Sequence, residues 1–200
     1  MSIIGIILAA GTSSRFNCNI PKQLYCINDT PILEYSINSM IKLVDKLIIV
    51  INKDIVLKDI IVKYKNIIII ENNINERKTS LNICIKYIQK NLNNVDKVII
   101  HDSARPFVTK TYFEELLKQK EKYNQYALSL TNGLYNTQSK LPVNRDEYIE
   151  LCTPICISYD ILKIQETDEI LDSIVYPPHF LFGTYNILKK ITTIDDIYIK

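Results

Sequence analysis

The chain has 200 residues, a formal net charge of +2 at pH 7, and 47% hydrophobic against 23% charged residues. These values are typical of a soluble globular protein, and the length suits one well-buried domain, residues 1–200, rather than two. So small a net charge gives no basis for a nucleic-acid or membrane partner, and we expect neither. Any strong positive field must therefore be local to a site.

The five cysteines form no C-x-x-C pair, and no signal-peptide pattern is found in the sequence. We therefore expect free thiols in a cytoplasmic protein, rather than disulfides or structural zinc. Cys152 and Cys156 have the spacing of metal ligands on a helix, but no histidine or further cysteine lies near them in the chain. The apolar runs are also too short for a membrane span.

An apolar run at residues 3–8 is typical of a parallel strand covered on both faces. Small and hydroxyl residues follow it at positions 9–14, then Arg15, and then Lys22 after the rigid Pro21. Backbone N–H groups in such a loop can hold phosphate oxygens, and the two cations can neutralise their charge. We predict a nucleoside triphosphate loop. It is neither a Walker loop nor a dinucleotide fingerprint, since it has one glycine and no Gly-Lys-Ser/Thr.

Short apolar runs alternate with segments of helical periodicity along the next part of the chain. Strands are predicted over residues 47–51, 67–70, 98–100 and 126–130, and helices over residues 31–41, 77–91 and 112–123. This alternation predicts an α/β fold, a mostly parallel sheet with helices on both faces. Such sheets bind ligands beyond the carboxyl ends of their strands.

A second polar stretch, residues 101–106, also follows a predicted strand directly. An aspartate there, above a triphosphate, is well placed to hold Mg²⁺. Taken alone, Asp102 could equally cap the next turn and pair with Arg105. The expected convergence with the phosphate loop on one sheet edge favours the metal site. His101 is interpreted as structural, because no Ser or Cys nucleophile accompanies it.

The alternation stops at residues 131–151, a polar stretch that is long for a connection inside a domain. It is either a projecting arm or a disordered loop. We favour an arm to a partner subunit, because Leu141, Val143, Tyr148 and Ile149 give it apolar side chains to pack. A helix is then predicted over residues 158–164, with a further apolar run at residues 179–182 and a short acidic helix start at residues 195–196.

Several short motifs resemble those of the 2-C-methyl-D-erythritol 4-phosphate cytidylyltransferases and the related ribitol-5-phosphate cytidylyltransferases. They are LAAG at 8–11, SR at 14–15, PKQ at 21–23, ER at 76–77 with Ser80, HDSARP at 101–106, VNR at 143–145, TP at 153–154, TDE at 167–169 and KIT at 190–192. The likeness spans nearly the whole chain in the same order. It implies a three-layer, Rossmann-like nucleotidyltransferase fold in which residues 131–151 build a homodimer.

The resemblance also implies that CMP passes from CTP to a polyol phosphate with Mg²⁺ and that pyrophosphate leaves. The acceptor's phosphate oxygen would attack the α-phosphorus in line, so catalysis would rest on positioning and charge neutralisation. By position, the catalytic charges would be those of Arg15, Lys22 and Lys190, and Asp102 would hold the metal. The nucleotide would contact small and polar residues: Ala9, Ala10, Gly11, Thr12, Asn75, Ser80 and Ser103.

On the acceptor side, the resemblance implies roles for Arg105 and Thr153, together with Arg145 from the neighbouring subunit. Two departures from the family pattern fall beside them. Residues 130–134 read LTNGL in place of Pro-Val-x-Asp-Thr, and Ile155 stands in place of a glutamine. These changes slightly favour a polyol-phosphate glycan precursor over an isoprenoid precursor, although both stay open.

A third departure concerns the base pocket, where Asn73-Ile74-Asn75 stand in place of Gly-Gly-Asp. An isoleucine cannot approach a base as closely as a glycine can. One alternative is therefore a nucleotidyltransferase with another base or a sugar-phosphate acceptor. Another is a nucleotide-binding homologue without turnover, against which the retained Arg15, Lys22, Asp102 and Lys190 argue.

Overall fold

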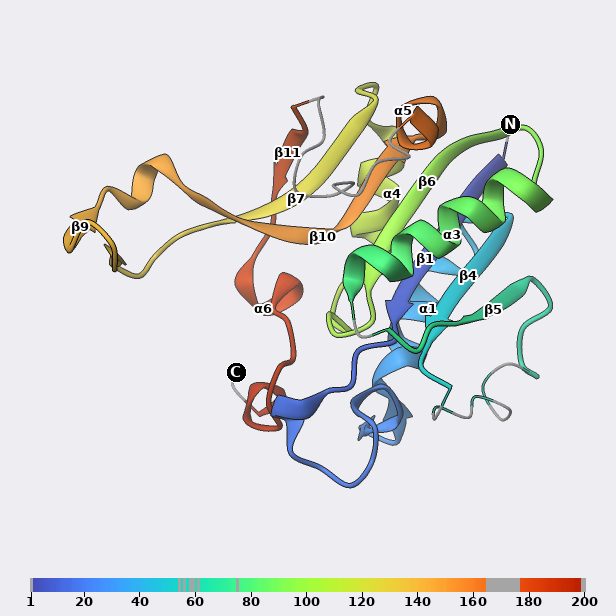
Figure 1. The fold of residues 1–200 in the computed structure, drawn as a ribbon, viewed down its shortest axis with the longest axis horizontal. Coiled ribbons are helices and arrows are strands. Elements are labelled where there is room, and N and C mark those ends of the chain that lie inside the picture. Colours follow the sequence, from blue (N-terminus) through green and yellow to red (C-terminus); the bar gives the residue numbers. More distant parts are fainter. Residues whose placement is uncertain are drawn as a thin grey trace.

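The computed structural model describes residues 2–53, 55, 57, 60, 62–74, 76–164 and 177–198. Seven strands of this part of the chain form one sheet in the order β11-β7-β10-β6-β1-β4-β5 (Figure 1). Their bounds are β1 Ser2–Ala9, β4 Lys46–Ile51, β5 Ile67–Glu71, β6 Val95–Asp102, β7 Tyr123–Ser129, β10 Ile149–Ser158 and β11 His179–Phe182. Neighbouring strands are parallel, except that β10 runs antiparallel to both β6 and β7. The predicted mostly parallel α/β sheet is confirmed.

Helices cover both faces of this sheet and enclose two cores. On one face, α1 (Ile32–Met40) and α4 (Lys110–Lys118) pack on residues such as Ile7, Ile49 and Ile99. On the other face, α3 (Arg77–Asn91) and α5 (Tyr159–Ile164) pack on the strand residues next to those, such as Ile6, Ile48 and Ile100. Successive strand residues point to opposite faces, so continuous Ile and Val runs supply both cores at once.

The predicted elements overlap the observed ones, but several bounds differ. The strands predicted over residues 98–100 and 126–130 are β6 and β7, which begin three residues earlier, and β10 was not predicted. The helix predicted over residues 77–91 is α3 with the same limits, and the run at residues 179–182 is β11. The helix predicted over residues 112–123 is wrong at its carboxyl end, because α4 ends at Lys118. Gln119 adopts an extended backbone with φ −66° and ψ 144°, and Tyr123 already begins the buried strand β7. Residues 167–169 lie outside the described part of the chain.

Residues 131–148 leave the body of the protein at one side of the sheet (Figure 1). Within this segment β8 (Leu134–Asn136) pairs with β9 (Leu141–Val143) as an antiparallel hairpin, and the short helix η3 (Arg145–Glu147) leads into β10. Its Tyr135, Leu141 and Tyr148 side chains are 60%, 62% and 51% exposed. A monomer therefore leaves large apolar side chains of this arm in water.

Three smaller features complete the described chain. A two-stranded ribbon of β2 (Cys26–Ile27) and β3 (Thr30–Pro31) precedes α1, and α6 (Tyr185–Leu188) precedes the carboxyl segment with η4 (Asp195–Ile197). All five cysteines are free, and burial raises the pKa of Cys152 and Cys156, which lie on β10 rather than a helix, to about 11. None of the described helices has the length and hydropathy that a membrane span requires.

Candidate active site

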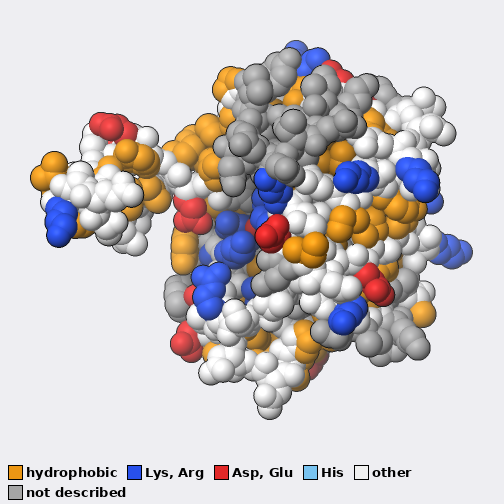
Figure 2. All heavy atoms as spheres, viewed as in Figure 1, with side chains coloured by type: hydrophobic (Ala, Val, Ile, Leu, Met, Phe, Trp, Pro, Cys, Tyr) orange, Lys and Arg blue, Asp and Glu red, His pale blue; other side chains and the backbone are white. Residues whose placement is uncertain are grey.

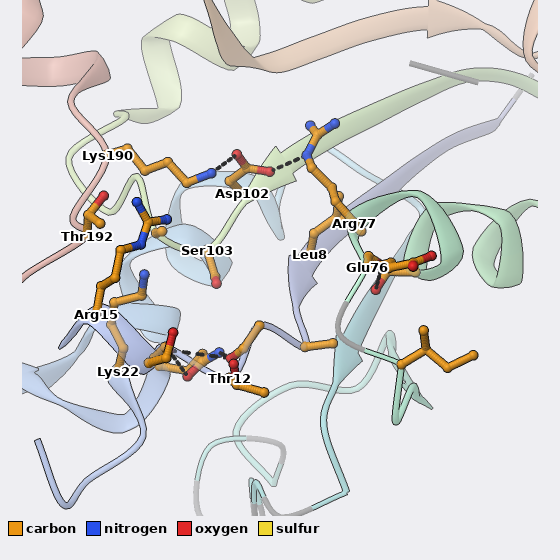
Figure 3. A pocket seen from close by; sticks show the side chains of 18 residues that line it. Leu8, Thr12, Arg15, Lys22, Glu76, Arg77, Asp102, Ser103, Lys190 and Thr192 are labelled. Atoms are coloured by element: carbon orange, nitrogen blue, oxygen red, sulfur yellow. Dashed lines mark hydrogen bonds and ion pairs between the residues drawn. The ribbon is translucent and has the colours of Figure 1, made fainter. Parts of the chain in front are cut away.

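The two polar stretches singled out in the sequence meet at the carboxyl edge of the sheet. Leu8 of β1 and Asp102 of β6 are register partners on adjacent parallel strands, and Ser103 N–H donates to the Leu8 carbonyl at 3.1 Å. A cavity of about 340 Å³ opens above them (Figure 3). Nine predicted site residues line it: Ala10, Gly11, Thr12, Arg15, Lys22, Ser80, Asp102, Ser103 and Lys190.

The loop after β1 is held open by a glutamine to which the sequence assigned no role. Gln23 is 3% exposed, and its Nε2 donates to the carbonyls of Ala9 and Gly11 at 2.6 and 2.9 Å. Ser13 takes a left-handed backbone with φ 57°. The PKQ motif, in which Gln23 follows Lys22, was the feature that could have pointed to it. Ala9 is buried at the end of β1 and supports the loop from below.

Three cations of the site, Arg15, Lys22 and Lys190, gather on one side of this cavity (Figure 3). Burial, Lys190 and Arg15 together lower the pKa of Lys22 to about 8. The three positive charges therefore repel one another in the free protein, and a polyanion such as a triphosphate would relieve that repulsion. Figure 2 shows Lys and Arg side chains gathered on the body near the base of the arm.

The Asp102 carboxylate lies between two cations (Figure 3). Its Oδ1 is 3.1 Å from Arg77 Nε, and its Oδ2 is 3.2 Å from Lys190 Nζ. Burial alone would raise the pKa of Asp102, but the charges of Arg77 and Lys190 outweigh it and hold the pKa well below its usual range. Asp102 is therefore ionised. Arg77, an unassigned part of the Glu-Arg motif, is the second residue that sequence reasoning missed.

A divalent cation fits this donor set only with help from the nucleotide. No cluster of three or more His, Cys, Asp or Glu side chains occurs among the described residues. Mg²⁺ in nucleotide sites is bound through one or two carboxylates plus phosphate oxygens, and it keeps several waters. Asp102 supplies one such carboxylate, and phosphate oxygens of the triphosphate would supply further ligands. Arg77 and Lys190 would then turn toward phosphate oxygens.

His101 supports the site from inside the protein. Its ring is fully buried, and burial lowers its pKa to about 4, so it is neutral. Because a carbonyl only accepts, Nε2–H donates to the Arg105 carbonyl at 3.2 Å, and Nδ1 accepts from Thr153 Oγ1 at 3.4 Å. The same Thr153 oxygen accepts the Asp102 N–H at 3.1 Å. The predicted acceptor residue Thr153 is thus tied to the predicted metal ligand.

A second cavity, of about 210 Å³, adjoins the first and shares Arg77, Asp102 and Lys190 with it. Arg105 and Thr153 line it, as do Gln125, Leu151, Cys152 and Ile155. The Arg105 side chain is 5% exposed, donates to the Leu188 carbonyl, and leaves its Nε without a partner among the described residues. Its Nη2 lies 3.8 Å from Glu150 Oε1, so the guanidinium already faces one anionic group at this cavity.

Ala9 and Arg145 are predicted site residues that line neither cavity. Arg145 lies on the arm, where its Nη1 donates to the Thr131 carbonyl, and it lines neither cavity of its own subunit. Asn75 lies outside the described residues. Its chain neighbour Ile74 lines the larger cavity and is 54% exposed, while its N–H donates to Asn72 Oδ1 at 3.0 Å.

The chain is similar to known proteins along most of its length. The family model "2-C-methyl-D-erythritol 4-phosphate cytidylyltransferase" (IspD) matches residues 3–197. Proteins of that name from Clostridium acetobutylicum and Clostridium kluyveri are 33% and 31% identical. The matches cover 96% and 97% of this chain, respectively, and 93% of each relative.

Solved structures of similar fold cover nearly the whole chain. The 4-diphosphocytidyl-2C-methyl-D-erythritol synthase of Anaerococcus prevotii superposes with a TM-score of 0.78 at 23% identity, over 98% of this chain and 93% of that one. The 2-C-methyl-D-erythritol 4-phosphate cytidylyltransferase of Thermus thermophilus gives 0.77 at 17% identity, over 99% and 96%. At these identities the superpositions support the fold.

Proposed function

Since the chain belongs to the IspD family and is a cytidylyltransferase, we propose that it transfers CMP from CTP to 2-C-methyl-D-erythritol 4-phosphate. The observation that carries this proposal is the pair of adjoining cavities that share Arg77, Asp102 and Lys190. One cavity carries the phosphate loop, and the other carries the buried Arg105. Such a pair suits a nucleotide and a phosphorylated acceptor that react where the cavities meet.

The sequence alone slightly favours a glycan precursor as the acceptor. The comparisons favour methylerythritol phosphate instead. The family model and both Clostridium relatives carry the methylerythritol name. In this proposal, the changes at residues 130–134 and at Ile155 alter the contacts that hold the acceptor, and the acceptor itself stays the same. The proposed product belongs to isoprenoid biosynthesis.

In this proposal the residues of the chain act mainly by position and charge. An oxygen of the acceptor phosphate attacks the α-phosphorus of CTP, and the bond between the α-phosphorus and the bridging oxygen to the β-phosphate breaks. The attacking oxygen is already ionised, so no general base is needed. Lys190, which lines both cavities, would contact the reacting phosphate, while Arg15 and Lys22 would neutralise the departing pyrophosphate.

We propose Mg²⁺ as the divalent cation of the site, held by Asp102 and by phosphate oxygens of CTP. When bound, it would withdraw negative charge from the phosphates during transfer. Arg77 would lose its carboxylate partner at that step and would be free to turn to the triphosphate. Support comes from the ionised state and burial of Asp102.

We further propose a homodimer in which Arg145 reaches the acceptor cavity of the neighbouring subunit. Support comes from the arm, whose apolar side chains are exposed in the monomer, and from the position of Arg145 away from its own cavities. Packing of two arms would bury Tyr135, Leu141 and Tyr148. A closed dimer of this kind repeats the same contact on both subunits.

Pyrophosphate release tests the proposal directly. Each of the four NTPs is combined with Mg²⁺ and with methylerythritol phosphate, ribitol phosphate or a sugar 1-phosphate. We expect CTP with methylerythritol phosphate to be used with at least about tenfold higher kcat/KM than any other pair. Preference for another pair would replace the substrates named here. CTP binding without turnover of any acceptor would instead support a non-catalytic homologue.

A further inference from the structure

The ladder between β7 and β10 is interrupted at the acceptor cavity. Leu151 pairs with Ala127 and Ile155 with Gln125, so β10 advances four residues while β7 advances two. The extra residues form a bulge that contains Cys152 and Thr153. Bulges re-aim side chains and leave backbone groups without their regular ladder partners.

A side chain of β7 supplies a hydrogen bond inside this bulge. Gln125 Nε2 donates to the Cys152 carbonyl at 3.3 Å, and Gln125 is only 5% exposed. The next residue, Thr153, accepts the Asp102 N–H through its hydroxyl. A continuous line of contacts therefore runs from β7 through the bulge of β10 to the metal-binding end of β6.

The orientation of the Gln125 amide is determined by its two partners. Tyr123 Oη is 2.6 Å from Gln125 Oε1, and burial raises the pKa of Tyr123 to about 12, so its hydroxyl stays protonated and donates. The Cys152 carbonyl can only accept, so the NH₂ group must face it. One N–H is used there, and Gln125 contributes to the lining of the second cavity.

We propose that Gln125 positions the Thr153 bulge and determines selectivity for the acceptor by hydrogen bonding to a hydroxyl of a polyol phosphate. The inference rests on the proposed function, because it takes the second cavity as the acceptor pocket. Gln125 lies beside Arg105 and Thr153 in that cavity. Arg105 attracts the charge of the acceptor, and Gln125 adds a donor that discriminates among hydroxyl patterns.

The test variant is Gln125→Met, which keeps the length of the side chain and removes its hydrogen bonds. Tyr123→Phe removes only the hydroxyl that orients the amide. The matched control is Tyr126→Phe on the opposite face of β7, where the phenol donates to Glu115 at 2.6 Å and lines neither cavity. All three are assayed for the acceptor KM and, without acceptor, for the CTP dissociation constant.

We expect Gln125→Met to raise the acceptor KM by about tenfold, Tyr123→Phe by a smaller factor, and Tyr126→Phe not at all. The CTP dissociation constant should change less than twofold in each. An unchanged acceptor KM in Gln125→Met would overturn the inference. An equal rise in the CTP dissociation constant would do so too, since it would indicate general distortion of the site.

Hydrogen exchange separates this inference from the proposed function. If wild-type protein transfers CMP to no polyol phosphate, the proposed function fails on that result alone. The positioning role is then decided by amide exchange in the segment 152–158, which should be faster in Gln125→Met than in wild type or Tyr126→Phe. Equal exchange in all three proteins would overturn it.

Discussion

Lys22 Nζ donates to the carbonyl oxygen of Ile191 at 2.8 Å, across 169 residues of sequence. Lys22 of the predicted phosphate loop is thus held by the segment that also carries Lys190. That segment is itself anchored, because Ile191 N–H donates to the Ala104 carbonyl at 2.8 Å and Asp196 Oδ2 accepts the N–H groups of Thr192 and Thr193. The carboxyl segment therefore positions two of the three cations.

Lys22→Ala should slow CMP transfer far more than it weakens the fold. Removal of one charged contact to the transition state costs roughly 3–4 kcal/mol, or about 10²–10³-fold in kcat. Single-turnover rates at saturating CTP give the measurement, with thermal unfolding as the check on the fold. Lys46→Ala, at an exposed position on β4, is the control and should match wild type. A wild-type rate in Lys22→Ala would remove Lys22 from the mechanism.

CTP binding should weaken as the pH rises through the pKa of Lys22, about 8 in the free protein. Burial, Lys190 and Arg15 lower this pKa, whereas Asp102 and Asp196 raise it, and a bound triphosphate would raise it further. Above pH 8 binding must take up a proton, so the dissociation constant should rise by up to about tenfold per pH unit. Calorimetry between pH 7 and 9.5 measures it.

The matched variant for this pH dependence is Lys22→Arg. A guanidinium stays charged throughout the range, so the rise above pH 8 should disappear even if affinity changes overall. A rise of the same size in Lys22→Arg would assign the titration to another group.

Asp102→Asn should change nucleotide binding and catalysis in opposite directions. Without Mg²⁺, the variant should bind CTP more tightly than wild type, since a negative charge is removed from beside the triphosphate and two cations are released. With Mg²⁺, transfer should fall by at least about 10²-fold, and more Mg²⁺ should be needed for half-maximal rate. Weaker metal-free binding together with a normal Mg²⁺ requirement would contradict the role of Asp102.

Subunit mixing tests whether Arg145 acts across a dimer. Arg145→Ala and Arg105→Ala should each be nearly inactive, but a mixed dimer would contain one site with both arginines intact. Equal mixing should therefore restore about a quarter of the wild-type activity. Light scattering at micromolar concentration should give a dimer, and Leu141→Asp on the arm should give a monomer. Failure of the mixture to recover activity would place Arg145 outside the neighbouring site.

The local pattern of the chain was sufficient for most elements and failed where tertiary contacts decide the ends. The spacing of Leu81, Cys84, Ile85 and Ile88 predicted α3 with its observed limits, because burial of one helix face is written in that period. The helix expected to continue to Tyr123 stops at Lys118 instead. The end of α4 depends on the pairing of β7 in the sheet. The charged residues before Tyr123 give no local signal of that pairing.

The position of β10 could not be predicted from the sequence for a similar reason. It runs antiparallel between β6 and β7, which brings Thr153 beside Asp102 and Gln125 beneath the bulge. Gln125 could have been singled out only as a polar residue in a buried strand. Which carbonyl it would meet depended on the partner strand.

The sequence by itself determined the alternation of strands and helices, and it placed the predicted phosphate loop and Asp102 at strand ends. Both follow from local sequence patterns. Apolar residues that repeat every 2 residues in a strand or every 3.6 residues in a helix indicate which face is buried. The tertiary structure alone decided the pairs Arg77–Asp102, Lys190–Asp102 and Lys22–Ile191. Those pairs join segments far apart in sequence. They form because the buried Asp102 carboxylate and the Ile191 carbonyl at the sheet edge need partners there.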